Sequence, residues 1–485
     1  MSTPSIEIEV LDNQLGIRAP ADAVLAIVAT AADGPFYTPV PTTRTKDLVD
    51  TFVAGPLVEA GAYAIERYGL TVLPVRTDAS VAGGFGTLTA DLQGTSEATI
   101  DDTTEPTDEL EVVIRFLTGG TVGTDGITYQ YSLDGGRTLS TTRALGTANN
   151  IVLPEAGNVR VNLAEGTIGA RGQLSFPTTA PCWNADELAE AITALRQTQA
   201  RWTLLEVYGD LDSVALSALD AGLEAMHSSG RNRRAIAHAR KPNADETPAT
   251  YLAALSTAFG DSFSRRVAVC AGYAKIDSSV SRRRYRRPPS LAVAPLAASV
   301  TEEIDLAELA YGPLPGVHIR DANGNPDEHD ETVFPGLDDA RFLTLRSWEN
   351  RAGVWVNNPR LFAPVGSDFL YLQYGRVIDL ACDVVRTELE PILSRGVEVL
   401  RDGSGRIDPE VATSIEGQLN ARLGDAIVAK RKGTAVTFTL SRTDDVLRTG
   451  SIGWQVRVLP LAYIKKLRGT VALVASASAP ANVRE

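Results

Sequence analysis

The chain contains few of the residues that build disulfide or metal-centred sites. Its 485 residues include only three cysteines, two methionines and four histidines. Cys182, Cys270 and Cys382 are far apart in the sequence, and no Cys-x-x-Cys pair occurs. This spacing argues against a disulfide framework and against a cysteine zinc site. We therefore predict three ordinary buried thiols, with no metal and no cofactor.

Several catalytic and nucleotide-binding motifs are also missing. The sequence has no Gly-Lys dipeptide, which a phosphate-binding P-loop requires. It has neither a G-x-S-x-G nor an H-E-x-x-H motif. No G-x-G-x-x-G follows the first predicted strand of the parallel sheet, so a dinucleotide site has no support. We interpret the glycine-rich residues 83–86 as a linker, because they stand at the entrance to a β-rich region.

Positive charge is scarce. The chain has 46 Lys and Arg against 60 Asp and Glu, a net charge of −14 at pH 7. This balance argues against a general nucleic-acid binder, since phosphate contacts need a basic face. It suits a soluble subunit that must not assemble prematurely. We expect no signal peptide and no membrane insertion, because the first residues lack a basic and apolar leader and no apolar run approaches about 18 residues.

Glycine and proline are abundant, with 41 and 26 residues, which favours many turns and β structure. A chain of this length is too long for one compact core, so we expect two to four domains. Residues 21–80 predict the first part of a central α/β core. They contain a buried strand over 23–29, one helix over 46–68 and a strand over 70–75.

Residues 81–178 have a different composition, with little helical periodicity and much Gly, Thr, Asp and Ser. The triplet Asp134-Gly135-Gly136 is a strong turn signal. We predict an all-β domain inserted into the surrounding fold. Its strands are expected over residues 110–117, 128–133, 151–153, 159–163 and 174–176.

The α/β core resumes over residues 179–365. Asn184, followed three residues later by Glu187, forms a capping box that begins a helix. Strands and helices then alternate, which is typical of a parallel sheet with crossover helices. Strands are expected over 203–208, 235–239 and 267–271, and helices over 214–227 and 248–259.

Residues 366–469 predict a C-terminal α+β domain. One helical pattern covers 370–393 and is interrupted late by Pro391. A second begins at Asp408, a capping residue, with Pro409 in the first helical position. Two strands are expected to follow, over 435–440 and 454–459. The fold class is therefore multidomain α/β and α+β.

The first residues alternate strictly, with Ile6, Ile8 and Val10 apolar and Glu7 and Glu9 charged. This pattern predicts a half-buried strand, yet no partner strand is close in sequence. A terminal strand without a local hairpin must pair at long range or with another molecule. We therefore treat residues 1–20 as an extended N-terminal arm.

Two charged clusters stand out. The acidic loop 327–331 could hold a cation, act as an acid/base pair, or be a solvated loop that faces a basic neighbour. The basic run could bind nucleic acid, although only Tyr285 could stack on a base, or pair with acidic surface on the same or a neighbouring subunit. We favour candidate electrostatic contacts at interfaces for both. Their residues are Arg282, Arg283, Arg284, Arg286 and Arg287, and Asp327, Glu328, Asp330 and Glu331.

Four ordered stretches resemble the sheath proteins of contractile phage tails and related injection systems. They are AVLAIVATAADGP at 23–35, PGLDDARF at 335–342, VWVNNPRL at 354–361 and GWQVRVLP at 453–460. The helix that bears Arg376, Asp379 and Arg386 is also similar in position. The β insertion matches least well.

The resemblance implies a sheath subunit without catalytic activity that forms stacked hexameric rings around an inner tail tube. Its arms would lend strands to the C-terminal domains of neighbours, through Ile6, Ile8 and Val10 at one end and Val471 and Leu473 of residues 470–485 at the other. The β domain would lie outside and the C-terminal domain inside, with Arg376, Asp379 and Arg386 on a tube-facing helix.

Contraction would be a rigid-body rearrangement of subunits that needs no fuel. The implied partners are further copies of the chain, the tail tube protein, and the baseplate and tail terminator proteins. The implied location is the virion, after assembly in the cytoplasm of a bacterial host. Two alternatives remain: another virion or secretion-apparatus structural protein, such as a baseplate or capsid-associated subunit, and an α/β hydrolase or transferase that uses the loop 327–331.

Overall fold

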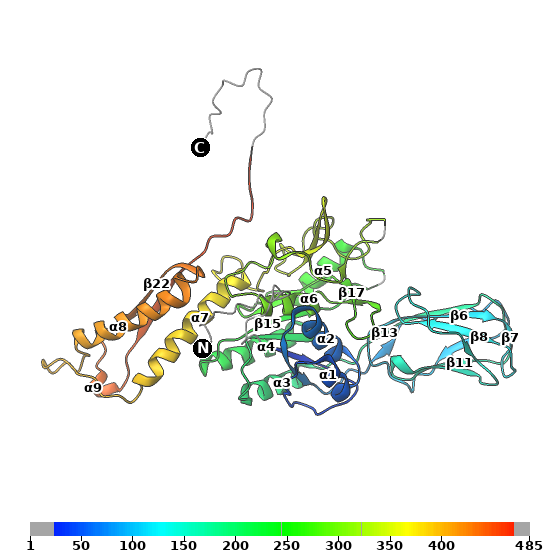
Figure 1. Cartoon of the computed structure of the whole chain (residues 1–485), viewed down its shortest axis with the longest axis horizontal. Helices are drawn as coiled ribbons and strands as arrows, with labels where there is room; N and C mark the ends of the chain where they lie inside the picture. The colour runs from blue at the N-terminus through cyan, green and yellow to red at the C-terminus, as the bar shows by residue number, and fades with distance from the viewer. Residues whose placement is uncertain (1–23, 244, 322, 470–485) are drawn as a thin grey trace, which may run out of the picture.

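The computed structural model describes residues 24–243, 245–321 and 323–469 (Figure 1). Its centre is a five-stranded sheet in the order β16-β15-β14-β1-β2, in which every neighbouring pair is parallel. The prediction of a parallel α/β sheet is thereby confirmed. Its strands are β1 (Val24–Ala29), β2 (Thr71–Arg76), β14 (Leu204–Leu211), β15 (Arg234–Ala239) and β16 (Val267–Cys270).

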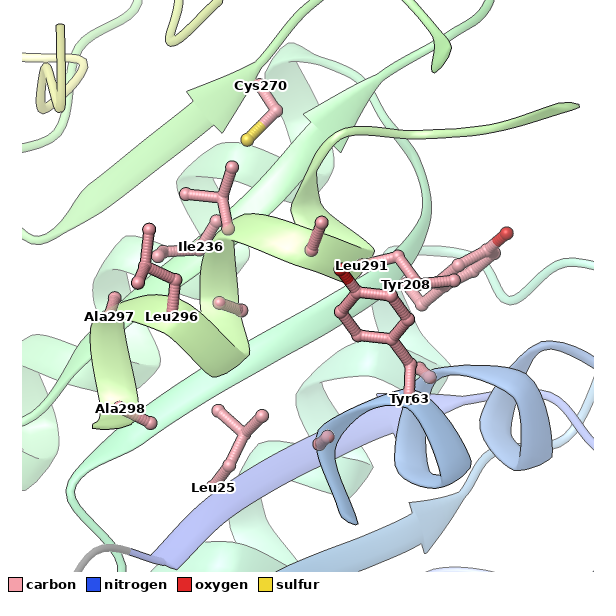
Figure 2. Packing of buried hydrophobic residues seen from close by; sticks show 14 of the residues in the cluster. Leu25, Tyr63, Tyr208, Ile236, Cys270, Leu291, Leu296, Ala297 and Ala298 are labelled. Atoms are coloured by element: carbon pink, nitrogen blue, oxygen red, sulfur yellow. The ribbon is translucent and has the colours of Figure 1, made fainter. Parts of the chain in front are cut away.

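Helices cover both faces of this sheet, so its strands are buried on both sides. In β1, Leu25 and Ile27 point into one core and Ala26 and Val28 into the other. Figure 2 shows the first core, where Leu25 of β1 lies beneath helix α6. The helices on this side are α1 (Thr45–Phe52), α2 (Pro56–Tyr68) and α6 (Ser290–Ser299), and those on the other are α3 (Ala185–Gln197), α4 (Ser213–Ser228) and α5 (Pro248–Phe259).

Two sequence expectations in this core were wrong or incomplete. The single helix expected over 46–68 is two helices, because Gly55 adopts φ 110° and Pro56 begins α2. A proline supplies no backbone N–H to continue a preceding helix, so it favours a new start. Helix α6 was not predicted at all. It has no polar face to give a periodic pattern, and it contains Pro295.

The insertion contains only strands and one short 3-10 turn, and every predicted strand is present. One sheet has the order β3-β13-β6-β8-β9 with β4 also on β13, and another has the order β10-β11-β5. Their inward residues form a separate core, to which Tyr285 of the α/β region also contributes. The main strands are β6 (Glu111–Thr118), β8 (Thr128–Ser132), β10 (Asn150–Leu153), β11 (Val159–Leu163) and β13 (Gln173–Thr179).

Smaller sheets flank the centre of the molecule. β18 (Arg284–Arg287), β17 (Ala274–Asp277) and β19 (Val317–His318) form one of them, and β20 (Leu345–Trp348) pairs with β21 (Arg351–Val356). The remaining short strands of the insertion are β3 (Gly84–Phe85), β4 (Thr89–Asp91), β5 (Ala98–Ile100), β7 (Gly120–Thr121), β9 (Arg143–Ala144) and β12 (Thr167–Ile168). Across the described residues, no helix has both the length and the apolarity needed to cross a membrane.

The C-terminal part has its own core, at the end of the molecule opposite the β insertion (Figure 1). It consists of α7 (Leu372–Leu389), α8 (Pro409–Leu423), α9 (Val446–Thr449) and the hairpin of β22 (Gly433–Leu440) and β23 (Trp454–Pro460). The predicted cap at Asp408 is confirmed, because its carboxylate accepts a hydrogen bond from the Glu410 backbone at 2.8 Å.

Candidate assembly surface

The hairpin β22–β23 is a sheet of only two strands. The two strands pair from Gly433 with Pro460 to Leu440 with Trp454, and among the described residues neither pairs with a third strand. Alternation places Val436, Phe438 and Leu440 on the face of the hairpin that meets the C-terminal core, and their partners across the hairpin are Val458, Val456 and Trp454.

Strand β23 is apolar and yet exposed. Its sequence is WQVRVLP, and all seven residues are exposed or only half-buried. Trp454 is 48% exposed although its ring stacks on Phe438, with the centroids 6.0 Å apart. An exposed, apolar strand at a sheet edge presents unpaired backbone groups to another strand. This edge is the strongest candidate for an assembly surface in the described structure.

Helix α7 carries the three residues that we expected to face a tube. The structure uses all three to hold α7 against the rest of the chain. Asp379 accepts hydrogen bonds from Arg234 at 2.6 and 3.0 Å, Arg376 donates to the backbone carbonyl of Val300 at 2.8 Å, and Arg386 donates to that of Ser229 at 3.0 Å. A tube-facing role for these groups stays a prediction, and each of the three side chains already makes a hydrogen bond within the chain.

The absence of a side chain at Gly375 allows Arg234 to pack against α7. A Cβ atom at Gly375 would overlap the guanidinium of Arg234, which crosses α7 at this point to reach Asp379. We expect Gly375→Ala to lower the free energy of unfolding by about 1–3 kcal/mol, because the arginine must leave a buried pair. Urea denaturation measures this loss. Gly417→Ala in α8 is the matched control, since no atom lies near its added Cβ.

Four of the five arginines of the basic run are ion-paired within the chain. Arg283 pairs with Glu155 at 2.5 Å, Arg284 with Asp277 at 2.6 Å, and Arg286 with Glu328 at 2.8 Å. Arg287 is buried and pairs with Asp108 at 2.6 Å, so it fastens the β insertion to the α/β core. The sequence allowed pairing with acidic residues of the same subunit or of a neighbouring one, and these four arginines pair within the same chain. Arg282 is exposed.

The acidic loop is similarly occupied. Asp327 pairs with Lys275 at 2.7 Å and Asp330 with Arg320 at 2.8 Å, while Glu331 lies 3.0 Å from His329. Burial opposes ionisation of Asp330, but hydrogen bonds from Ser347, Thr332 and Arg320 together outweigh it and lower the pKa of this carboxyl. In the part of the chain that the structure describes, no three His, Cys, Asp or Glu residues are placed to hold a metal ion.

A Ser, His and Asp come together where sequence analysis predicted no site. His238 Nδ1 lies 3.0 Å from Ser290 Oγ, and His238 Nε2 lies 3.8 Å from Asp210 Oδ1. Burial lowers the pKa of His238 to about 3. Ser290 is fully buried at the start of α6, so its hydroxyl cannot reach a substrate. His238 and Ser290 belong to the core, whereas the Asp210 side chain is 56% exposed.

The predicted arm residues lie outside the described residues. They are Ile6, Ile8, Val10, Val471 and Leu473. Their pairing with a neighbour stays a prediction.

Sequence comparison matches residues 3–360 to the family model described as DUF2586, N-terminal domain. The chain belongs to this family. The match ends before α7, so the hairpin β22–β23 lies beyond the matched residues. A search of curated proteins finds no match.

Solved structures similar to this DUF2586 chain include two sheath tail proteins. That of Listeria innocua has a TM-score of 0.45 and 12% identity, and covers 92% of this chain and 97% of its own. That of Desulfitobacterium hafniense has a TM-score of 0.45 and 8% identity, and covers 95% and 100%. The anti-feeding prophage baseplate contains a chain with a TM-score of 0.49 and 12% identity, covering 98% and 99%. The expected resemblance to tail sheath proteins is confirmed.

One buried carboxyl of the central sheet has no partner. Glu206 in β14 is fully buried, and neither of its oxygens has a hydrogen-bond partner among the described residues. Burial raises its pKa well above the ordinary value, so the carboxyl is held neutral.

We expect Glu206→Gln to remove a pH dependence of stability. Burial raises the pKa of Glu206 in the folded state, so the unfolded chain ionises first as the pH rises above the unfolded pKa, near 4.3. The unchanged chain therefore loses stability with rising pH until the folded pKa is reached. The stability of the variant relative to the unchanged chain should therefore grow by about 1.4 kcal/mol per pH unit in this window. Urea denaturation between pH 5 and 8 measures it. If the free energies of unfolding of the two chains differed by the same amount at every pH, Glu206 would ionise in the folded chain as it does in the unfolded one.

Proposed function

We propose that this chain is a structural subunit of a contractile tail sheath. Copies polymerise as stacked hexameric rings around an inner tail tube, and rigid-body movement of subunits drives the tube through a cell envelope. The exposed apolar strand β23 carries the proposal, because an edge of this kind presents unpaired backbone groups to which another strand can add. The chain has no catalytic role in this proposal.

Terminal arms of neighbouring copies are the proposed cover. Ile6, Ile8 and Val10 alternate with two glutamates, so an added strand would turn an apolar face to the core and an acidic face to solvent. Val471 and Leu473 would supply the second arm. Each arm binds at high effective concentration once its own domain is docked in a ring, and this makes assembly cooperative.

Six segments take separate parts in this proposal. Residues 21–80 and 179–365 form the α/β core, residues 81–178 lie on the outer surface, and residues 366–469 lie on the inner side, towards the tube. Residues 1–20 and 470–485 form the arms. The intrachain ion pairs of Arg283 with Glu155 and of Arg287 with Asp108 join the core to the β insertion and support their movement as one rigid body. Arg282 is the member of the basic run best placed for a contact with a neighbour.

The partners in this proposal are further copies of the chain, a tail tube protein, and baseplate and tail terminator proteins. The particle is a virion or a related injection system, and the chain assembles in the cytoplasm of a bacterial host. A baseplate or capsid-associated role is the second candidate, which a stable small oligomer would favour.

Deletion of residues 1–10 tests the strand donation. We expect the shortened chain to remain folded and soluble, because the five-stranded sheet and its two cores lie within the described residues. It should no longer form polymers that sediment, whereas the full chain does. Circular dichroism supplies the control for folding. Polymers of normal length from the shortened chain would contradict strand donation by this arm.

A further inference from the structure

A hollow beside the second half of α7 is lined by apolar side chains. Its volume is about 500 Å³, and its walls include Val385, Leu389, Leu393 and Trp454. Leu393 is 73% exposed. Exposed leucine and tryptophan around a hollow mark a surface that a partner covers. We call this hollow the α7 groove.

Residues 461–469, the strap, follow β23 and lie against the other end of α7. Tyr463 donates a hydrogen bond to the backbone carbonyl of Glu303 at 2.5 Å, and Lys465 pairs with Asp305. The Tyr463 ring lies 5.5 Å from that of Tyr374, near the start of α7. The strap's apolar side chains point elsewhere, with Ile464 78% exposed and Leu467 85% exposed.

The strap and the α7 groove cannot meet within one chain. Tyr374 beside the strap and Leu389 in the groove are about four helical turns apart, or roughly 20 Å. Leu467 is two residues from the anchored Lys465, so it reaches only about 7 Å further. In Figure 1 the chain leaves β23 away from the end of α7 that faces α9.

Charge complements the apolar match. Lys466 and Arg468 of the strap make no ion pair with the residues that the structure describes. The second half of α7 and the turn after it carry Asp383, Glu388 and Glu390, of which Glu388 pairs with Arg422 and Glu390 with Arg386. The whole chain has a net charge of −14. The negative net charge of one copy therefore attracts the basic strap of another, and the apolar side chains of the strap match the apolar walls of the groove.

We infer that the strap of one copy docks into the α7 groove of a second copy. This contact rests on the proposed assembly of the chain and adds to strand addition at β23. It joins two different surfaces head to tail, so it generates a ring or an open filament and not a closed pair.

Cys382, a half-buried residue that lines the groove, offers a direct test. Full-length chain with Leu467→Cys, oxidised in solution, should give a ladder of disulfide-linked dimers, trimers and larger species on a non-reducing gel. The ladder should be lost in Leu467→Cys/Cys382→Ser. A product that stops at dimers, no ladder, or a ladder that persists without Cys382 would overturn the inference.

A second measurement separates this contact from the sheath proposal. Leu393→Asp should weaken self-association at least tenfold in sedimentation velocity. Val365→Asp, at a residue 91% exposed and outside both surfaces, should leave it unchanged. Equal effects of the two would overturn the inference. A disulfide ladder from a chain that forms no tubes would support the strap contact and contradict the sheath proposal. Tubes from a chain that gives no ladder would support the sheath proposal and contradict the strap contact.

Discussion

Replacing Arg287 with methionine should lower the free energy of unfolding by about 3–5 kcal/mol. The guanidinium is buried, and it donates to Asp108 Oδ2 at 2.6 Å and to the backbone carbonyl of Glu109 at 2.7 Å. Without the guanidinium, the Asp108 carboxylate is buried with no cation beside it. Burial already raises the pKa of this carboxyl. Urea denaturation measures the loss.

Two controls distinguish a lost pair from a lost side chain. Arg283→Met removes the pair with Glu155, a half-exposed carboxylate, and should cost less than about 1 kcal/mol. The double variant Arg287→Met/Asp108→Leu removes both buried charges and should regain most of the stability. A single Arg287→Met variant as stable as the unchanged chain would mean that the β insertion is held by other contacts.

Replacing Val458 with lysine should abolish polymerisation while leaving the monomer folded. Val458 of β23 is half-buried on the inward face of the hairpin, opposite Val436. A lysine that points inward on an edge strand blocks the addition of another strand. The cost to the monomer should be only about 1 kcal/mol, because the valine is not fully buried and the lysine stem can lie along the surface.

Thr437→Lys is the matched control for this variant. Thr437 lies on the outward face of β22 and is exposed, so a lysine there does not enter the core. Sedimentation velocity compares the two chains at equal concentration. Equal polymerisation of both would mean that the β23 edge takes no part in assembly.

The regular elements of the fold were predictable because their patterns are local. The buried run that forms β1, the turn at Gly135 and the helix capped by Asp408 each depend on neighbouring residues. Helix α6 was not predicted, because a helix buried on all sides has no periodic pattern of apolar residues. The break between α1 and α2 at Gly55 was not predicted, because the apolar spacing continues across it.

The roles of charged residues were harder to predict because they depend on partners far away in sequence. Arg286 and Glu328 were expected at interfaces, yet they pair with each other across 42 positions. Asp379 meets Arg234 from a distant strand. A count of charges cannot distinguish these internal pairs from contacts with neighbours. The exposed edge of β23 likewise became visible only when burial was known.

Negative-stain electron microscopy of the purified full-length chain tests the central claim most directly. The account predicts tubes or stacked rings with six-fold symmetry that form from soluble subunits as concentration rises. A single small oligomer that persists under every salt condition would contradict it.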